Sequence, residues 1–464
     1  MSYAYYDRLT ALDASFLELE SASVHMHVGS VGIFESGSLA RPEGGVDFDR
    51  ICTIVGAGLR RVPRFRQKIA RVPWTEHPVW VDDPQFNLPY HLRHTALPTP
   101  GDERQLKRLT GRIMSQKLDR AKALWEMWVV EGLEHGRFAL ISKIHHCLID
   151  GISGVDLAGA YMGRDPNVRL KPDEARWLPR PAPSRTKLIS DDLLRRVSLP
   201  ARNLVRGAWQ PRQGIRSATR AIQGLRETLG VALTPASETP FNRSIGPHRR
   251  FDWTRCELST VRGIKDHLGG KLNDVVLACV AGAVRRFLLH RNVDVNGIDF
   301  RVLVPVSTRT AKEHGKLGNR VSMIAARLPV GEKDIRRRYD AVVAETVHIK
   351  ESDQVEGTEA IEQLSDWTTT TLLTQFSKLA ASRRSFNLIV TNVPGPAFTS
   401  YLDGARLLET YPLVPLFSNQ ALGIAVLSYD GGLYWGFNAD WEALPDLHVF
   451  VEGLEEEFEL LRKL

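Results

Sequence analysis

The stretch FALISKIHHCLIDG, residues 138–151, decides the interpretation of this chain. An apolar run, typical of a buried strand, ends in the adjacent pair His145 and His146, and Asp150 and Gly151 follow before a helical pattern begins. Consecutive residues of a strand point to opposite faces, so both histidines cannot face one reacting centre while the strand continues. We therefore expect one histidine to face the site and the other to pack against it or orient it.

One imidazole at the end of a buried strand is suited to general base catalysis. Its ordinary pKa, near 6.5, lets it take a proton from a hydroxyl at neutral pH. Asp150 is expected to fix the local backbone or to accept a hydrogen bond from an arginine, and Gly151 allows the chain to turn. The sequence contains no GxSxG motif for a nucleophilic serine. Direct transfer of an acyl group from an activated thioester to a hydroxyl is therefore the most economical mechanism.

Other types of site have weaker support in the sequence. Adjacent histidines make a poor zinc pair, and no HExxH or HxxEH spacing accompanies them. His25 and His27 fall on one face of a predicted strand, but no third ligand is evident, so no metal site is predicted. The glycine-rich segments match neither a P-loop nor a dinucleotide fingerprint, so no cofactor is predicted.

The composition indicates a folded protein of two or three domains. The chain has 464 residues, of which 43% are hydrophobic and 25% are charged. Its four cysteines form no CxxC pair, which argues against a disulfide scaffold or a zinc ribbon and favours a reducing, cytoplasmic location. The N-terminus lacks the pattern of a signal peptide. The purest long apolar run, residues 275–284, is half of the roughly 20 residues that a bilayer requires.

The positive charge is concentrated in the middle of the chain. Residues 171–250 hold 16 lysines and arginines against 6 acidic residues, a net charge of +10, so the rest of the chain carries −3 of the total of +7. The segment begins as a Pro/Arg-rich linker and continues with a basic amphipathic helix near residues 215–225. A connector between domains and a contact with a membrane or lipid-droplet surface are the two main interpretations. Nucleic-acid binding is not predicted, because no known reader module is present.

The flanking regions predict an α/β fold in two lobes, with an N-terminal lobe over residues 1–170 and a C-terminal lobe over 251–464, joined by the segment 171–250. Strands are predicted at 25–35, 125–133, 138–146, 300–307, 386–393 and, as a hairpin, 421–440. Helices are predicted at 104–118, 272–291 and 446–464.

Several further motifs resemble one known family. Besides HHCLIDG they include LTALDASFLELE near the N-terminus, WVDDPQFNLPYHLRH, LNDVVLACVAGAVRRFL and IVTNVPGP. With these motifs, which extend over nearly the whole chain, the sequence resembles the bacterial wax ester synthase/acyl-CoA:diacylglycerol acyltransferases of the HHxxxDG superfamily. The resemblance implies two chloramphenicol-acetyltransferase-like sandwich lobes, with the histidine pair at their interface.

The resemblance also implies roles for individual residues. His146 would be the general base, and His145 would support it. Asp150 would be structural, with Arg301 as a candidate ion-pair partner. The pair Asn273 and Asp274 begins a predicted helix, where Asn273 would either contact the substrate or the developing oxyanion, or cap the helix. One departure from the family is Ala123, which replaces a proline in the motif Pro-Leu-Trp and puts the shape of the substrate channel in question.

The function implied is transfer of a long-chain acyl group from acyl-CoA to a lipid hydroxyl, either that of diacylglycerol, giving triacylglycerol, or that of a fatty alcohol, giving a wax ester. Acyl-CoA and a lipid alcohol are the expected partners, at the periphery of a membrane or lipid inclusion. Two alternatives are a condensation-type acyltransferase that uses carrier-bound substrates, and a weakly active paralogue that binds acyl lipids on inclusions. The sequence leaves the oligomeric state open.

Overall fold

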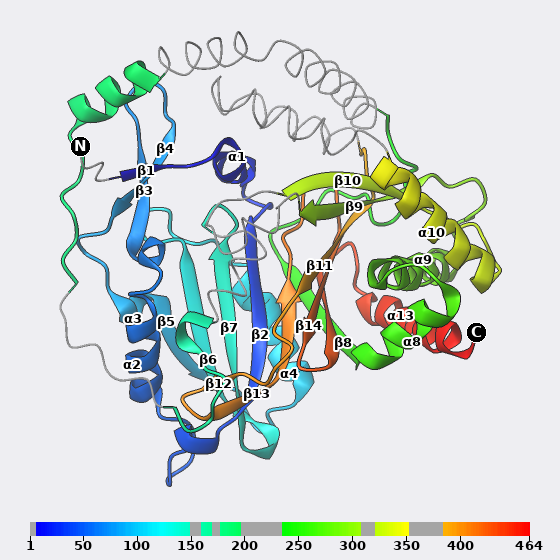
Figure 1. The fold of residues 1–464 in the computed structure, drawn as a ribbon, viewed down its shortest axis with the longest axis horizontal. Coiled ribbons are helices and arrows are strands. Elements are labelled where there is room, and N and C mark those ends of the chain that lie inside the picture. Colours follow the sequence, from blue (N-terminus) through cyan, green and yellow to red (C-terminus); the bar gives the residue numbers. More distant parts are fainter. Residues whose placement is uncertain (1–5, 149–158, 169–176, 196–233, 308–320, 352–383) are drawn as a thin grey trace.

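The computed structural model describes residues 6–148, 159–168, 177–195, 234–307, 321–351 and 384–464. Within them, two six-stranded sheets and one three-stranded sheet form the framework, and helices pack around the sheets (Figure 1). The arrangement in two mixed α/β lobes confirms the predicted fold class.

The N-terminal lobe is built on the first six-stranded sheet. Its strands, in spatial order, are β12 (Tyr401–Leu402), β13 (Ala405–Leu413), β2 (His27–Glu35), β7 (Arg137–His145), β6 (Trp125–Leu133) and β5 (Leu92–Ala96). β7 pairs antiparallel with both β2 and β6, and alternating residues of these strands are directed to opposite faces of the sheet. The predicted strand at 125–133 is confirmed as β6, and the strand predicted at 138–146 is shifted by one residue.

The helices of this lobe pack around the first sheet. They are α1 (Ala11–Leu19), α2 (Phe48–Gly58), α3 (Leu88–His91) and α4 (Glu103–Met114), with short 3-10 turns at Gly37–Leu39, Pro63–Arg66 and Glu134–Gly136. α4 begins with a capping box, in which Asp102 and Gln105 each accept from the other's backbone N–H. α1 lies over the end of the sheet where β7 finishes and β2 begins (Figure 1). The small sheet joins β1 (Tyr6–Arg8), β4 (Pro78–Asp82) and β3 (Gln67–Arg71).

One strand of the N-terminal sheet comes from the C-terminal half of the sequence. β13 pairs antiparallel with β2, so that Tyr411 faces Val31 and Leu413 faces Gly29. Arg50 on α2 reinforces this exchange with a two-pronged ion pair to the Asp403 carboxylate, in the turn before β13. The domain limits 1–170 and 251–464 stay a prediction, but residues 401–413 belong to the first sheet.

The C-terminal lobe is built on the second six-stranded sheet. In spatial order its strands are β10 (Val321–Leu328), β9 (Phe300–Ser307), β11 (Leu388–Pro394), β14 (Leu422–Tyr429), β15 (Gly432–Asp440) and β8 (Arg249–Glu257). β14 and β15 form the predicted hairpin, whose turn at Asp430 and Gly431 uses positive φ at both residues. The strand at 300–307 has the predicted bounds.

Four helices cover one face of the second sheet (Figure 1): α8 (Leu258–Leu268), α9 (Leu272–His290), α10 (Ile335–Glu351) and α13 (Leu447–Lys463). α9 packs against α8, α10 and α13, which explains why the apolar run 275–284 is buried around its whole circumference. Within the described residues, no helix is both long enough and apolar enough to cross a membrane.

The two lobes share one continuous hydrophobic core. Polar contacts between α4 and β8 add to it: the Arg249 backbone N–H donates to Ser115 Oγ at 2.8 Å, and Lys107 pairs with Asp252 at 2.6 Å. Gly436 allows a close approach to β13, because a Cβ atom there would lie 1.8 Å from the Pro412 carbonyl oxygen.

Residues 177–195 of the basic segment pack against the N-terminal lobe, whereas residues 234–250 contact the C-terminal lobe, as the hydrogen bond from the Ser237 N–H to the Asp299 carbonyl shows. Arg180 binds the Asp82 carboxylate at 2.9 Å, and residues 185–195 form a helix whose Leu188 joins the small apolar cluster of the three-stranded sheet. The predicted basic helix near residues 215–225 lies outside the described residues.

Candidate active site at the end of strand β7

The histidine pair lies where β7 ends. His145 is the last residue of the strand and is paired with His27 of β2, while His146 is the first residue beyond it. Backbone hydrogen bonds hold both residues: the His145 N–H donates to the Leu124 carbonyl at 2.9 Å, and the His146 N–H donates to the Met26 carbonyl at 2.7 Å. The pair is therefore fixed to the strands on either side of β7.

His145 is fully buried and carries no charge at neutral pH. Its Nδ1 accepts a hydrogen bond from the Cys147 backbone N–H at 3.1 Å, which places the ring proton on Nε2. Burial, with smaller contributions from Arg120 and His146, lowers the pKa of His145 to about 3. A ring with this pKa is a weak base, and one of its nitrogens is already in use.

His146 is half-buried, in contrast to its neighbour. Its ring stacks on Phe16 of α1, with ring centroids 4.1 Å apart and planes inclined by 25°. The stacking fixes the plane of the imidazole while part of the side chain stays accessible. Of the two histidines, His146 is therefore the one that a substrate can reach.

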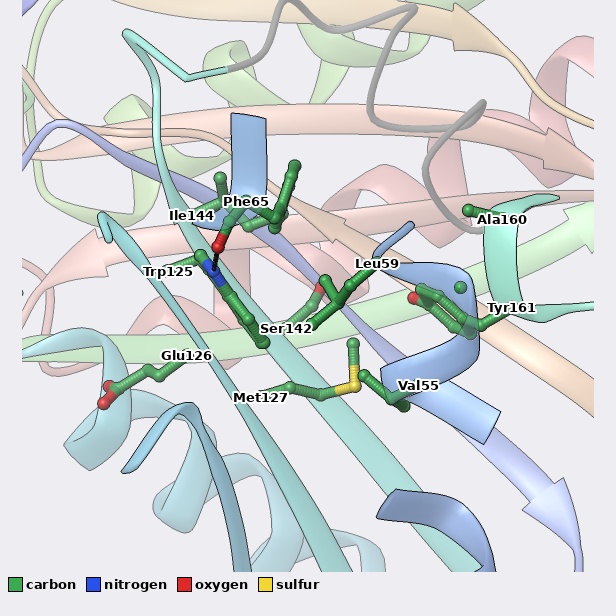
Figure 2. Close-up of a pocket in the computed structure, with 11 residues that line it drawn as sticks. Val55, Leu59, Phe65, Trp125, Glu126, Met127, Ser142, Ile144, Ala160 and Tyr161 are labelled. Atoms are coloured by element: carbon green, nitrogen blue, oxygen red, sulfur yellow. Dashed lines mark hydrogen bonds between the residues drawn. The ribbon is translucent and has the colours of Figure 1, made fainter. Parts of the chain in front are cut away.

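The two faces of the sheet differ in chemistry beside the histidine pair. Trp125 and Met127 of β6 and Ser142 and Ile144 of β7 line an apolar pocket on one face (Figure 2). The side chains of Glu126 and Lys143, which lie between them in sequence, point to the opposite face and are charged.

The apolar pocket is enclosed between this sheet and α2. Val55 and Leu59 line one side together with Tyr161, which lies beside α2, and Phe65 lies next to Trp125 (Figure 2). Trp125 Nε1 donates to the Phe65 carbonyl at 2.8 Å, which fixes the indole in the wall. The cavity enclosed by these side chains has a volume of about 10 Å³, which is the room that about one water molecule needs.

The opposite face holds a buried ion pair. Lys143 has no exposed side-chain surface and pairs with Glu126, directly across from it on β6. Its ammonium also donates to the Ile113 and Gln116 carbonyls, at 2.9 and 3.0 Å, at the end of α4. The pair fastens α4 to the strand that carries the histidines.

The other predicted site residues have different outcomes. Asp150 and Gly151 lie outside the described residues. The Arg301 guanidinium pairs with the Asp299 carboxylate and donates to the Thr234 carbonyl, so its described contacts tie it to the neighbouring end of β9.

Of the two roles considered for Asn273, that of N-cap is contradicted, because α9 begins at Leu272, before Asn273. Lys271 occupies the N-cap position, and Asn273 is the second residue of the helix. Asp274 stabilises this end instead: its carboxylate accepts from the Lys271 backbone N–H at 2.7 Å, as the third residue of a helix can. Asn273 is half-buried in the first turn.

Ala123, which replaces the family proline, is buried just before β6. Its carbonyl accepts from the Trp125 N–H at 2.9 Å, and the next carbonyl, of Leu124, holds His145. The alanine at position 123, in place of the family proline, therefore lies close to both the apolar pocket and the histidine pair.

Comparison with known proteins identifies the family of this chain. The family model "Wax ester synthase/diacylglycerol acyltransferase catalytic domain" matches residues 9–276, and the C-terminal domain of the same family matches residues 317–462. The chain belongs to the wax ester synthase/diacylglycerol acyltransferase family. As a member of this family it is an acyltransferase, and acyl-CoA is the donor.

Relatives within the family cover nearly the whole chain. One protein of Mycobacterium tuberculosis that is named a diacylglycerol O-acyltransferase is 32% identical over 474 residues. The match covers 98% of this chain and 90% of the relative. A protein of the same species named a probable diacylglycerol O-acyltransferase is 29% identical and covers 97% and 94%. The wax ester synthase/diacylglycerol acyltransferase of Marinobacter aquaeolei VT8 matches in structure with a TM-score of 0.70 and 25% identity, over 98% of this chain and all of that one.

More distant structures share the fold alone. A condensation domain of the calcium-dependent antibiotic synthetase matches with a TM-score of 0.62 at 16% identity, and covers 100% and 97% of the two chains.

Sequence reasoning missed the residues that surround the histidine pair. Phe16 and Glu20 lie more than 120 positions before the pair, and nothing in their local pattern connects them to it. Two signals in the sequence could have pointed to them. Lys143 interrupts an otherwise apolar strand, and His25 and His27 are two positions apart at the start of β2.

Proposed function

We propose that His146 is the general base for transfer of a long-chain acyl group from acyl-CoA to a lipid hydroxyl. The observation that carries this proposal is the contrast between the two histidines. His145 is buried, uncharged and already bonded through Nδ1, whereas His146 is half-exposed and fixed against Phe16. An accessible imidazole held in a fixed plane can remove the proton of a hydroxyl that binds beside it.

The reaction then needs no covalent enzyme intermediate. His146 takes the proton of the acceptor hydroxyl as its oxygen attacks the thioester carbonyl carbon. The tetrahedral intermediate collapses, the carbon–sulfur bond breaks, and the CoA thiolate receives the proton from His146. The products are an ester and free CoA, and the histidine returns to its neutral form.

The apolar pocket, widened by movement of its side chains, is the proposed place for part of the acyl chain. β7, the strand that leads to His146, forms one of its walls, and the side chains of Trp125, Met127, Ile144 and Leu59 make its lining almost entirely apolar. Burial of methylene groups there would contribute about 0.8 kcal/mol each, so the pocket favours long chains over short ones.

The proposed acceptor is diacylglycerol, with fatty alcohols as a second possible substrate. The names of the M. tuberculosis relatives support the first, and that of the Marinobacter protein supports both. Asn273 is retained as a proposed contact for the acceptor or the oxyanion. The Asp274 carboxylate is engaged by the end of α9.

Because such acceptors are insoluble in water, we also propose that the protein acts at the periphery of a membrane or lipid inclusion. The net charge of +10 over residues 171–250 supports an anionic surface as the partner. Charge reversal of Arg216, Arg220 and Arg226 should weaken binding to anionic vesicles and preserve turnover of detergent-dispersed substrate. Unchanged vesicle binding would contradict this part of the proposal.

The acceptor can be identified with purified protein, palmitoyl-CoA and a panel of dispersed acceptors. Diolein, hexadecanol, cholesterol and glycerol would be compared by free CoA release and by chromatography of the lipid products. We expect triacylglycerol from diolein as the main product. Turnover only with a phosphopantetheinyl carrier donor would indicate condensation chemistry, and tight acyl-CoA binding without any ester product would indicate a lipid-binding protein.

A further inference from the structure

A second group of polar side chains is buried behind the histidine pair, on the face opposite the apolar pocket. His27 and His145 are cross-strand neighbours with ring centroids 6.1 Å apart and planes inclined by 75°. The Glu20 carboxylate lies 3.8 Å from His27 Nε2. The side chains of all three are at least 95% buried.

Among the residues that the structure describes, these groups contain polar atoms for which no hydrogen-bond partner is found. They are His145 Nε2, both ring nitrogens of His27, and Glu20 Oε1. A buried polar atom left without a partner costs about 1–3 kcal/mol, so several of them in one place indicate a network that is closed by further contacts. The other Glu20 oxygen accepts a hydrogen bond from Arg120 Nε at 2.7 Å.

The positions of the ring protons give the network a direction. His145 carries its proton on Nε2, because Nδ1 accepts from the Cys147 N–H. His27 is neutral, because burial and the nearby Lys143 lower its pKa well below 6.5. A neutral ring offers one donor and one acceptor, which allows His27 to accept from the His145 side and donate to the Glu20 carboxylate.

We propose that Glu20, His27 and His145 form a directional hydrogen-bond relay, bridged by an internal water molecule, that fixes the tautomer and orientation of His145 and so positions His146. Internal waters typically occupy sites of this kind, where two to four polar groups converge. A water molecule can donate to one of these nitrogens and accept from another, as the two neutral rings require.

The relay orients the base and carries no proton during turnover. The proposed reaction returns the hydroxyl proton to the CoA thiolate, so no proton needs to leave through the interior. Its effect on catalysis passes through the backbone: His145 and His146 are adjacent, and the His146 N–H is bound by Met26, next to His27. Glu20 and His27 are therefore positioning residues.

The test uses the full-length protein with His27→Phe, Glu20→Gln and the double variant. Each single change should lower kcat for triacylglycerol formation by about 10- to 100-fold, the usual effect of losing a group that orients a reactive one, with the KM for palmitoyl-CoA within about twofold. The double variant should lose no more than His27→Phe alone, because the residues act as one unit.

His25→Phe is the matched control. His25 lies two residues before His27, outside β2, is also buried, and its Nε2 is hydrogen-bonded to the Ala22 carbonyl at 3.0 Å. It should change kcat by no more than about threefold. Equal losses in His25→Phe and His27→Phe, or additive losses in the double variant, would overturn the relay. If His27→Phe does not fold, Glu20→Gln, which preserves the size of the side chain, decides the question.

A second measurement separates this proposal from the function on which it rests. Long-range ¹H–¹⁵N correlation of histidine-labelled protein reports ring tautomers, with His145 assigned by the signal lost in His145→Gln. We expect one fixed tautomer protonated at Nε2 in the wild type, and exchange between tautomers in Glu20→Gln. Exchange already present in the wild type would overturn the relay, whereas a wild type without acyltransferase activity would contradict only the proposed function.

Discussion

The buried ion pair between Lys143 and Glu126 gives a prediction with a definite energy. In Lys143→Met the apolar stem is largely preserved and the ammonium is lost. Glu126 then stays buried, with Arg93 at 3.3 Å as its remaining partner, and the carbonyls of Ile113 and Gln116 lose their donor.

The cost follows from the burial of both groups. Breaking a buried pair by removal of one partner typically costs about 3–5 kcal/mol, since the other charge is left uncompensated. Arg93 is one-third exposed and relieves part of this penalty, so we expect about 3 kcal/mol for Lys143→Met. Removing both charges in Lys143→Met/Glu126→Leu should recover most of that, which leaves a loss of about 1 kcal/mol and a coupling energy of at least 2 kcal/mol.

The assay is urea unfolding followed by tryptophan fluorescence, with a complete double-mutant cycle. Lys117→Met, at an exposed lysine of the same region, is the control and should change the stability by no more than about 0.5 kcal/mol. Additive losses in the double variant, or a loss below 1 kcal/mol in Lys143→Met, would refute the account of how α4 is held to β7.

Three further predictions concern pH, packing and chain length. The pKa of His145 is about 3 when folded and about 6.5 when unfolded, so the unfolded chain binds more protons between these values, and the free energy of unfolding should fall by about 2 kcal/mol from pH 7 to pH 5; equal stability in urea at both pH values would contradict this. Gly29→Ala would bring a Cβ within 1.9 Å of the Ser142 carbonyl oxygen and should destabilise the protein by more than 3 kcal/mol, whereas Gly263→Ala, with open space in a helix, should stabilise it by about 0.5–1 kcal/mol in the same assay. Met127→Trp should fill the apolar pocket and shift the preference from palmitoyl-CoA toward octanoyl-CoA by at least tenfold in kcat/KM, and an unchanged preference would place the acyl chain elsewhere.

The sequence predicted those parts of the fold whose signal is local. The apolar strand ending in the histidine pair, the apolar helix α9 and the hairpin at Asp430 all have short-range patterns, and each was found within one or two residues. β13 could not be found in this way, because it joins the first sheet by pairing with β2, almost 380 positions earlier in the chain.

The candidate site shows the same division. The motif identified His146 and His145, since their spacing from Asp150 is written in one short stretch. The surroundings that distinguish the two rings come from two other segments of the chain: Phe16 on α1, and the backbone of Met26 with His27 at the start of β2. The burial of His145 and the accessibility of His146 follow from these tertiary contacts, which no local pattern encodes.

The central claim, that His146 is the base, is tested most directly by kcat for triacylglycerol formation from palmitoyl-CoA and diolein in His146→Ala. The variant should bind palmitoyl-CoA and unfold like the wild type, but its kcat should fall by about 10²- to 10⁴-fold, the range of a general base. A folded His146→Ala variant with wild-type kcat would contradict the account.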